Sequence, residues 1–144
     1  MAGIVDCKRK NTILLFYVLV FAIVCSTLWY FRHENWFFLG IVEILLIFII
    51  PLGALCYGYK TGDSLRSFLA GTLPYGFFIL LILSDFQNQL WNSTYLLLFA
   101  GYHISLLLCA GLIGLLASMK EKLPRSVAIM LSVLWILIFL SGIN

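Results

Sequence analysis

The sequence predicts an all-α, polytopic membrane protein: a bundle of five transmembrane helices with its N-terminus inside and its C-terminus outside. Hydrophobic residues make up 63% of the 144 residues and charged residues only 10%, whereas soluble domains are roughly half apolar and about a quarter charged. The apolar residues form long unbroken runs, so the alternating pattern of an outer-membrane barrel is excluded. An ordinary cytosolic fold and a disordered chain are excluded by the same composition.

Five apolar runs come close to the roughly 20 residues that a membrane-crossing helix requires. They cover residues 12–31, 36–59, 68–84, 95–118 and 126–143. Backbone groups in hydrocarbon must be satisfied within their own segment, so each run is expected to be a helix. The connections are short, and we therefore expect one transmembrane domain over residues 1–144. Pro51 and Pro74 fall inside the second and third runs, where we expect kinks.

The basic residues set the expected orientation. Eight of the nine Lys and Arg residues fall on one side of the predicted spans, and only Arg32 falls on the other. The eight are Lys8, Arg9, Lys10, Lys60, Arg66, Lys120, Lys122 and Arg125. This positive-inside bias predicts a multi-pass protein of the cell membrane. The net charge of +3 then reflects topology, and we expect no nucleic-acid partner because the chain has no basic surface on a soluble domain.

The first run resembles a secretory signal peptide, with Lys8–Lys10 as its basic start. We expect it to remain as a helix, because it is long for a signal core and no small-residue cleavage site precedes Arg32.

The four cysteines are expected to be buried packing residues. No two of them share a Cys-x-x-Cys spacing, so neither a redox pair nor a zinc site is indicated. They are Cys7, Cys25, Cys56 and Cys109. No other pattern in the sequence indicates a metal or a particular cofactor.

Glu43 and His103 are the two strongly ionisable residues well within the predicted spans. Such residues are costly in a membrane and usually face a bundle interior or a cavity. Counted from the outer ends of their spans, they lie about 10 and about 12 Å deep by helix rise. At 100° per residue, His103 shares a face with Ala110 and Gly114, and small residues allow helices to approach closely. A contact between Glu43 and His103 requires the second and fourth spans to be neighbours.

A carboxylate and an imidazole at one depth could share a proton, coordinate a cation or bind the polar head of a ligand. The structural alternative is a buried hydrogen bond that fixes the register of two helices. Tyr75 and Tyr102 could add hydroxyl groups to such a pocket, or could serve in packing alone. Asp85 could widen an outer vestibule, or could be a solvated helix end.

The expected function is therefore binding or transport of a small solute, proton or cation at Glu43 and His103. Five helices enclose little volume, so we expect a homo-oligomer or other membrane subunits to complete the pathway. The alternative is a structural or accessory subunit of a larger membrane complex, whose small-residue seams would dock partner helices. Those seams are Ala110, Gly114 and Ser118 in one helix and Ser67, Gly71 and Tyr75 in another. An intramembrane acid–base enzyme acting on a lipid-like substrate is a third hypothesis, less favoured because it needs a third group within reach.

Overall fold

A computed structural model of the chain describes residues 2–31, 36–86 and 93–141. The side chains of residues 36–43 and 84–86, which include Glu43 and Asp85, lie outside the described part. Five helices account for nearly all of the described residues, and none of these residues forms a strand. The helices are α1 (Ala2–Phe31), α2 (Trp36–Thr61), α3 (Ser64–Phe86), α4 (Ser93–Ser118) and α5 (Lys122–Ser141). The predicted all-α class is confirmed, with one helix for each predicted run.

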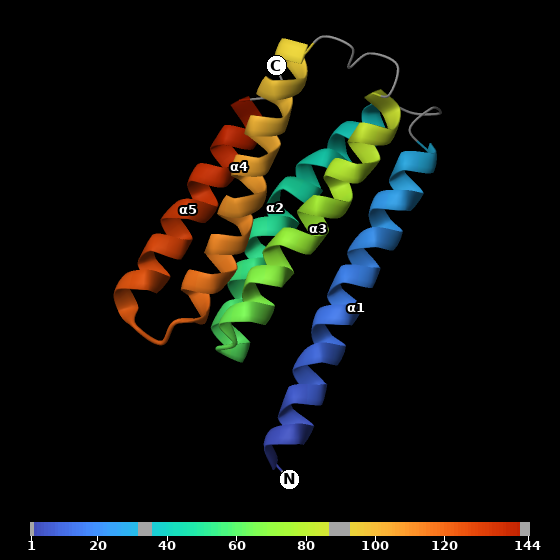
Figure 1. The fold of residues 1–144 in the computed structure, drawn as a ribbon. Helices are drawn as coiled ribbons and strands as arrows, with labels where there is room; N and C mark the ends of the chain where they lie inside the picture. Colours follow the sequence, from blue (N-terminus) through green and yellow to red (C-terminus); the bar gives the residue numbers. More distant parts are fainter. Residues whose placement is uncertain (1, 32–35, 87–92, 142–144) are drawn as a thin grey trace.

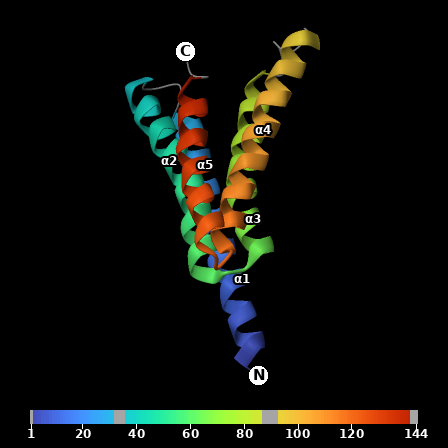
Figure 2. The same cartoon turned by 90° about the vertical axis from the view of Figure 1, so that its left-hand side faces the viewer.

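The helices run alternately up and down (Figure 1). Two tight turns, at residues 62–63 and 119–121, join α2 to α3 and α4 to α5 at the same end of the bundle. We call this end the turn end. The start of α1 also lies there, whereas α5 finishes at the opposite end. α4 contacts α2, α3 and α5, and α1 packs mainly against α3. Figure 2 shows that α2 and α4 separate toward the opposite end.

Glycine contacts hold α4 against α2 and α3. Gly114 of α4 lies so close to the backbone of Ser67 of α3 that a Cβ on Gly114 would overlap the Ser67 carbonyl oxygen. A Cβ on Gly58 of α2 would overlap the Gly114 carbonyl oxygen, and one on Gly71 of α3 would overlap that of Ala110. Small residues are typical of helix interfaces in membranes because they allow this close approach.

The small-residue seams therefore pack against each other within the chain. Ser118 Oγ completes the contact by donating to Ser64 Oγ at 3.1 Å. The close-approach surface of these seams is thus occupied by neighbouring helices of the same chain.

The turn between α2 and α3 follows local rules. Gly62 has a φ of 60°, a left-handed conformation that suits glycine just past a helix end. Asp63 caps α3, with its Oδ1 accepting a hydrogen bond from the backbone N–H of Arg66 at 3.1 Å. Asp63 is therefore the N-cap of α3.

Neither inner proline ends its helix. Pro51 lies inside α2 and Pro74 inside α3, and both side chains are fully buried. Neighbouring helices therefore cover both points at which the backbone hydrogen-bond ladder is broken.

Two of the described segments are long and apolar enough to cross a membrane, Leu97–Ser118 and Lys122–Ser141. The described apolar stretches Asn11–Thr27 and Ile47–Thr61 are shorter. The large apolar side chains of the bundle are widely exposed; examples are Phe16 at 69%, Leu97 at 74% and Met130 at 72%.

The cysteines only partly match their prediction. Cys25 is buried and Cys109 is half-buried, but Cys56 is exposed on α2. The side chain of Cys7 lies outside the described residues.

Candidate functional site

His103 is hydrogen-bonded to Tyr75 in the middle of the bundle. The Tyr75 hydroxyl oxygen lies 2.8 Å from His103 Nδ1 and joins α3 to α4. Tyr75 is fully buried and His103 is 8% exposed. A hydrogen bond between two polar groups in so apolar a bundle avoids the cost of leaving either group unsatisfied.

The helical positions explain how this contact arises. His103, Ala110 and Gly114 are all buried on one face of α4, as the predicted periodicity requires. On α3, Ser67, Gly71 and Tyr75 occur at intervals of four residues and form the facing stripe. The glycine contacts between α3 and α4 bring the stripes together at the turn end, and the His103–Tyr75 hydrogen bond follows along the same interface.

Aromatic rings surround the pair. The Phe99 ring centroid lies 4.1 Å from that of His103, and the Tyr102 centroid lies 5.1 Å from it. On the Tyr75 side, Trp135 of α5 makes an edge contact at 5.4 Å between centroids, and Phe139 stacks on Trp135 at 5.3 Å. Residues from α3, α4 and α5 thus enclose the imidazole and the phenol in apolar surface.

Tyr102 and Trp135 satisfy their own polar atoms on the neighbouring backbone. The Tyr102 hydroxyl donates to the Ile138 carbonyl at 3.1 Å, and Trp135 Nε1 donates to the Leu106 carbonyl at 2.9 Å. Tyr102 therefore contacts the His103 ring but does not direct its hydroxyl at it. Both bonds tie α4 to α5.

The predicted pairing of Glu43 with His103 falls partly outside the described residues, because the Glu43 side chain is not among them. α2 and α4 are neighbours, as that pairing requires. Their closest approach, at Gly58 and Gly114, is at the turn end, and the two helices diverge toward the end where α2 begins (Figure 2). The Asp85 side chain also lies outside the described part, so the predictions for Glu43 and Asp85 remain predictions.

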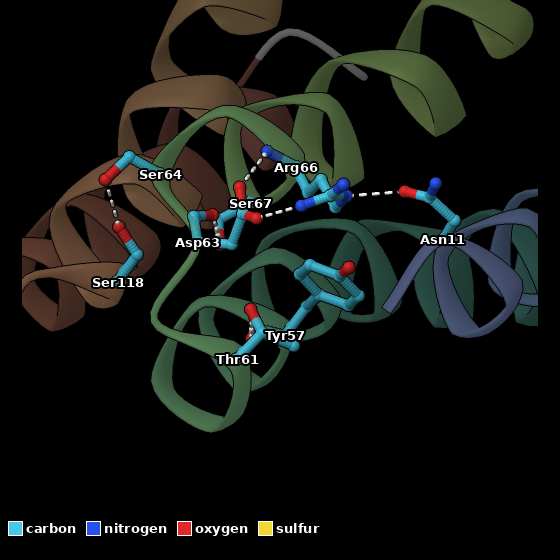
Figure 3. Close-up of polar contacts among 8 residues, drawn as sticks. All are labelled: Asn11, Tyr57, Thr61, Asp63, Ser64, Arg66, Ser67 and Ser118. Atoms are coloured by element: carbon cyan, nitrogen blue, oxygen red, sulfur yellow. Dashed lines mark hydrogen bonds and ion pairs between the residues drawn. The ribbon is translucent and has the colours of Figure 1, made fainter. Parts of the chain in front are cut away.

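A second polar cluster lies at the turn end (Figure 3). Arg66 forms an ion pair with Asp63 within the first turn of α3, and its Nε donates to Asn11 Oδ1 of α1 at 2.5 Å. Ser67 Oγ donates to the Asp63 carbonyl at 2.5 Å, and Tyr57 lies beside this group. The cluster stabilises the start of α3 and the contact between α1 and α3.

Sequence reasoning named Tyr75 as a possible contributor but missed its direct contact with His103. It also missed Phe99, Trp135 and Phe139 as the enclosing rings. A signal was present in the spacing, since Tyr75 continues the Ser67–Gly71 stripe that was recognised as a packing seam. The register between α3 and α4, however, depends on which glycine meets which carbonyl, and the linear pattern does not contain that information.

The comparisons with known proteins leave this site to be interpreted from its chemistry alone. No protein-family model matches the chain, and no curated protein or solved structure is similar enough to it to indicate a relative. Among the described residues, no group of three or more His, Cys, Asp and Glu side chains is placed to hold a metal ion.

Proposed function

We propose that this chain is a multi-pass membrane protein that crosses the bilayer five times and binds a small solute, proton or cation at His103. The distribution of exposed and buried side chains supports the placement of the chain in a membrane. Large apolar groups such as Leu15, Phe16 and Leu137 are more than half exposed, whereas Ser67, His103 and Ser132 are buried. An apolar exterior around a polar interior suits hydrocarbon as the surrounding solvent.

The charge distribution supports a single orientation. Lys60, Arg66, Lys120, Lys122 and Arg125 all belong to the turn end, where α1 also begins. The positive-inside rule then places this end, and the N-terminus, on the cytoplasmic side. Reporter domains fused to the two termini should lie on opposite sides of the membrane, while reporters on the same side would contradict a five-span arrangement.

The observation that carries the binding site is the buried His103–Tyr75 hydrogen bond. Tyr75 occupies Nδ1 of the imidazole, and no other described side chain bonds to the ring. Nε2 is thus the atom with which His103 would meet a ligand. With Nδ1–H donating to the phenol oxygen, Nε2 accepts a proton or ligates a cation; in the other tautomer, Nε2–H donates to a solute oxygen.

Glu43 is proposed as the second polar group of the site. It lies on α2, the neighbour of α4, and a carboxylate would balance the charge of a bound cation or protonated imidazole. A homo-oligomer or another membrane subunit would complete the pathway, because one bundle of five helices encloses little space.

Flux measurements on the purified chain in sealed vesicles test this function. Protons, Na⁺ and K⁺ are the probes, followed with a pH-sensitive dye or radioactive cations under an imposed gradient. We expect flux of one of them to be lost in His103→Ala and Glu43→Gln, while both variants still insert. His33→Ala is the matched control, because it removes the other histidine of the chain, which the sequence places in an outer loop. Undiminished flux in both site variants would exclude the proposal.

A second candidate is an accessory subunit of a larger membrane assembly. It is favoured by the exposed apolar face of α5, on which Met130, Val133 and Leu137 are all more than half exposed. A partner helix could cover this face as well as lipid could. Purification in a mild detergent distinguishes this candidate from the binding or transport protein. Recovery of a stable, pure protein without a foreign partner would count against an accessory subunit.

A further inference from the structure

We propose that the turn end carries a binding surface for the headgroup of an anionic phospholipid, formed by Tyr59, Lys60, Lys120, Lys122 and Arg125. We call these five residues the basic patch. The inference rests on the membrane placement proposed above, but it concerns residues far from His103 and does not depend on transport.

Arg125 is held in place by two contacts to other elements. Its guanidinium carbon lies 4.4 Å from the centre of the Tyr59 ring on α2, and its Nε donates to the Met119 carbonyl in the turn before α5 at 2.9 Å. A guanidinium over an aromatic face is stabilised by the ring's quadrupole. Because these contacts use the ring-facing surface and Nε, the two terminal nitrogens retain their fork geometry for a phosphate.

Three exposed lysines lie close in sequence to Arg125 or to its partner Tyr59. Lys60 follows Tyr59 directly, Lys122 lies one helical turn before Arg125 on α5, and Lys120 precedes it in the turn. Of the nearby acidic groups, Asp63 is paired with Arg66, which leaves the exposed Glu121 as the opposing charge of the turn. The first turn of α5 contains no acidic residue, so its two cations lie at the helix end where the dipole favours an anion.

A lipid fits this surface better than a free anion because apolar side chains adjoin the charges. Leu123 is 75% exposed and Met119 is 39% exposed, and both lie in sequence among the patch residues. In the proposed orientation the patch is at headgroup level on the cytoplasmic side, where anionic lipids attract basic residues. Leu123 and Met119 then meet the upper part of the acyl chains while Arg125 and the lysines meet the phosphate.

Native mass spectrometry of the full chain in mixed micelles tests the proposal. The micelles contain equal amounts of phosphatidylglycerol and phosphatidylcholine, and the measurement is the ratio of the two lipids that remain bound. We expect the wild type to favour phosphatidylglycerol, and each removed charge to lower that preference about fivefold. Lys122→Gln/Arg125→Gln should therefore lower the preference about 25-fold. Tyr59→Leu keeps every charge but removes the support of Arg125, and it should lose part of the preference.

Arg9→Gln is the matched control. It also removes one exposed positive charge, but from α1, which does not contact α5 in the described part of the chain. The proposal is overturned if the wild type shows no preference, if Arg9→Gln loses as much as Arg125→Gln, or if Tyr59→Leu keeps the full preference. Displacement of the lipid by millimolar inorganic phosphate would also overturn it, because the site would then take a free anion.

Carbonate extraction distinguishes a chain that is not an integral membrane protein from one that lacks only the lipid preference. A chain that alkaline carbonate releases from membranes is not an integral protein, and the proposed function then fails together with this inference. A chain that carbonate leaves in the membrane, but that binds both lipids equally, contradicts only the basic patch.

Discussion

Gly114 of α4 lies directly against the backbone carbonyl of Ser67 of α3, with no room for a side chain between them. The carbonyl oxygen of the same glycine lies where a Cβ on Gly58 of α2 would have to be. One residue thus sets the closest approach of three helices. The His103–Tyr75 hydrogen bond, further along the interface of α3 and α4, depends on the register that this contact establishes.

Gly114→Ala should therefore destabilise the bundle. The added methyl group would overlap a backbone atom, which can move only if the whole helix moves, and overpacking of this kind costs about 1–3 kcal/mol. Thermal unfolding of the detergent-solubilised protein measures the loss.

Gly101→Ala is the matched control, since it makes the same change on the same helix. Beyond the adjoining residues and backbone of α4 itself, no atom lies within 4 Å of a Cβ at Gly101. Alanine favours a helix over glycine by about 1 kcal/mol. We expect this variant to be as stable as the wild type or slightly more stable. Equal effects at the two positions would mean that α3 and α4 are not in close contact at Gly114.

The Tyr75–His103 hydrogen bond should be measurable as a coupling energy. Tyr75→Phe removes the hydroxyl while keeping the ring, and His103→Ala removes the imidazole. Interhelical hydrogen bonds in membrane proteins contribute about 0.6 kcal/mol on average, with values up to about 1.7. We expect the double variant to be more stable than the sum of the two single losses predicts, by an amount in this range.

Tyr102→Phe serves as the reference for this cycle. Its hydroxyl bonds to the Ile138 carbonyl, although its ring contacts His103. Coupling between Tyr102→Phe and His103→Ala should be smaller than for Tyr75→Phe. If both tyrosines couple equally to His103, the imidazole is held by ring packing and not by the Tyr75 hydroxyl.

The class of fold could be predicted from the sequence because it depends on the length and composition of single segments. Five apolar runs gave five helices, and the stripe of His103, Ala110 and Gly114 was predicted from the period of the helix. The capping role of Asp63 is equally local, since a short acceptor side chain beside a glycine suits a helix start.

The partners across helices could not be predicted in the same way. Tyr75 meets His103 because backbone contacts at Gly71 and Gly114 set the relative height of α3 and α4. Many residues on each helix share the correct face, and a periodic pattern does not distinguish among them. The same reason explains why Ser67 and Gly71, correctly recognised as packing positions, were assigned to an outside partner.

The start of α3 provides a third prediction, in which the cap and the ion pair of Asp63 can be separated. Asp63→Asn keeps an oxygen that can accept from the Arg66 N–H but removes the ion pair with Arg66. The partly exposed ion pair contributes little, so this variant should lose less than about 1 kcal/mol. Asp63→Ala removes both contacts, and loss of a helix cap adds about 1 kcal/mol.

Thermal unfolding of the two detergent-solubilised variants checks that Asp63→Ala loses more stability than Asp63→Asn. The Asn11→Ala variant should resemble Asp63→Asn, because the bond from Arg66 to Asn11 joins exposed side chains. A larger loss in Asp63→Asn than in Asp63→Ala would show that the charge, and not the cap, determines the stability of this helix start.

The contact between α1 and α2 gives a fourth prediction, which contrasts with that for Gly114. A Cβ on Gly53 would overlap the hydroxyl of Tyr17. This hydroxyl donates a hydrogen bond to the Ile49 carbonyl at 3.3 Å. Here the obstacle is the end of a side chain and not a backbone. Gly53→Ala should therefore cost less than Gly114→Ala, because Tyr17 can rotate away at the expense of one long hydrogen bond.

The sign of the effect should reverse once Tyr17 is removed. In a Tyr17→Ala background the methyl group at position 53 has space, and the gain in helix propensity of about 1 kcal/mol should then dominate. Gly53→Ala is thus expected to destabilise the wild type slightly but to stabilise Tyr17→Ala, as measured by thermal unfolding of the four proteins of the cycle. The same effect in both backgrounds would mean that α1 does not pack on α2 through Tyr17.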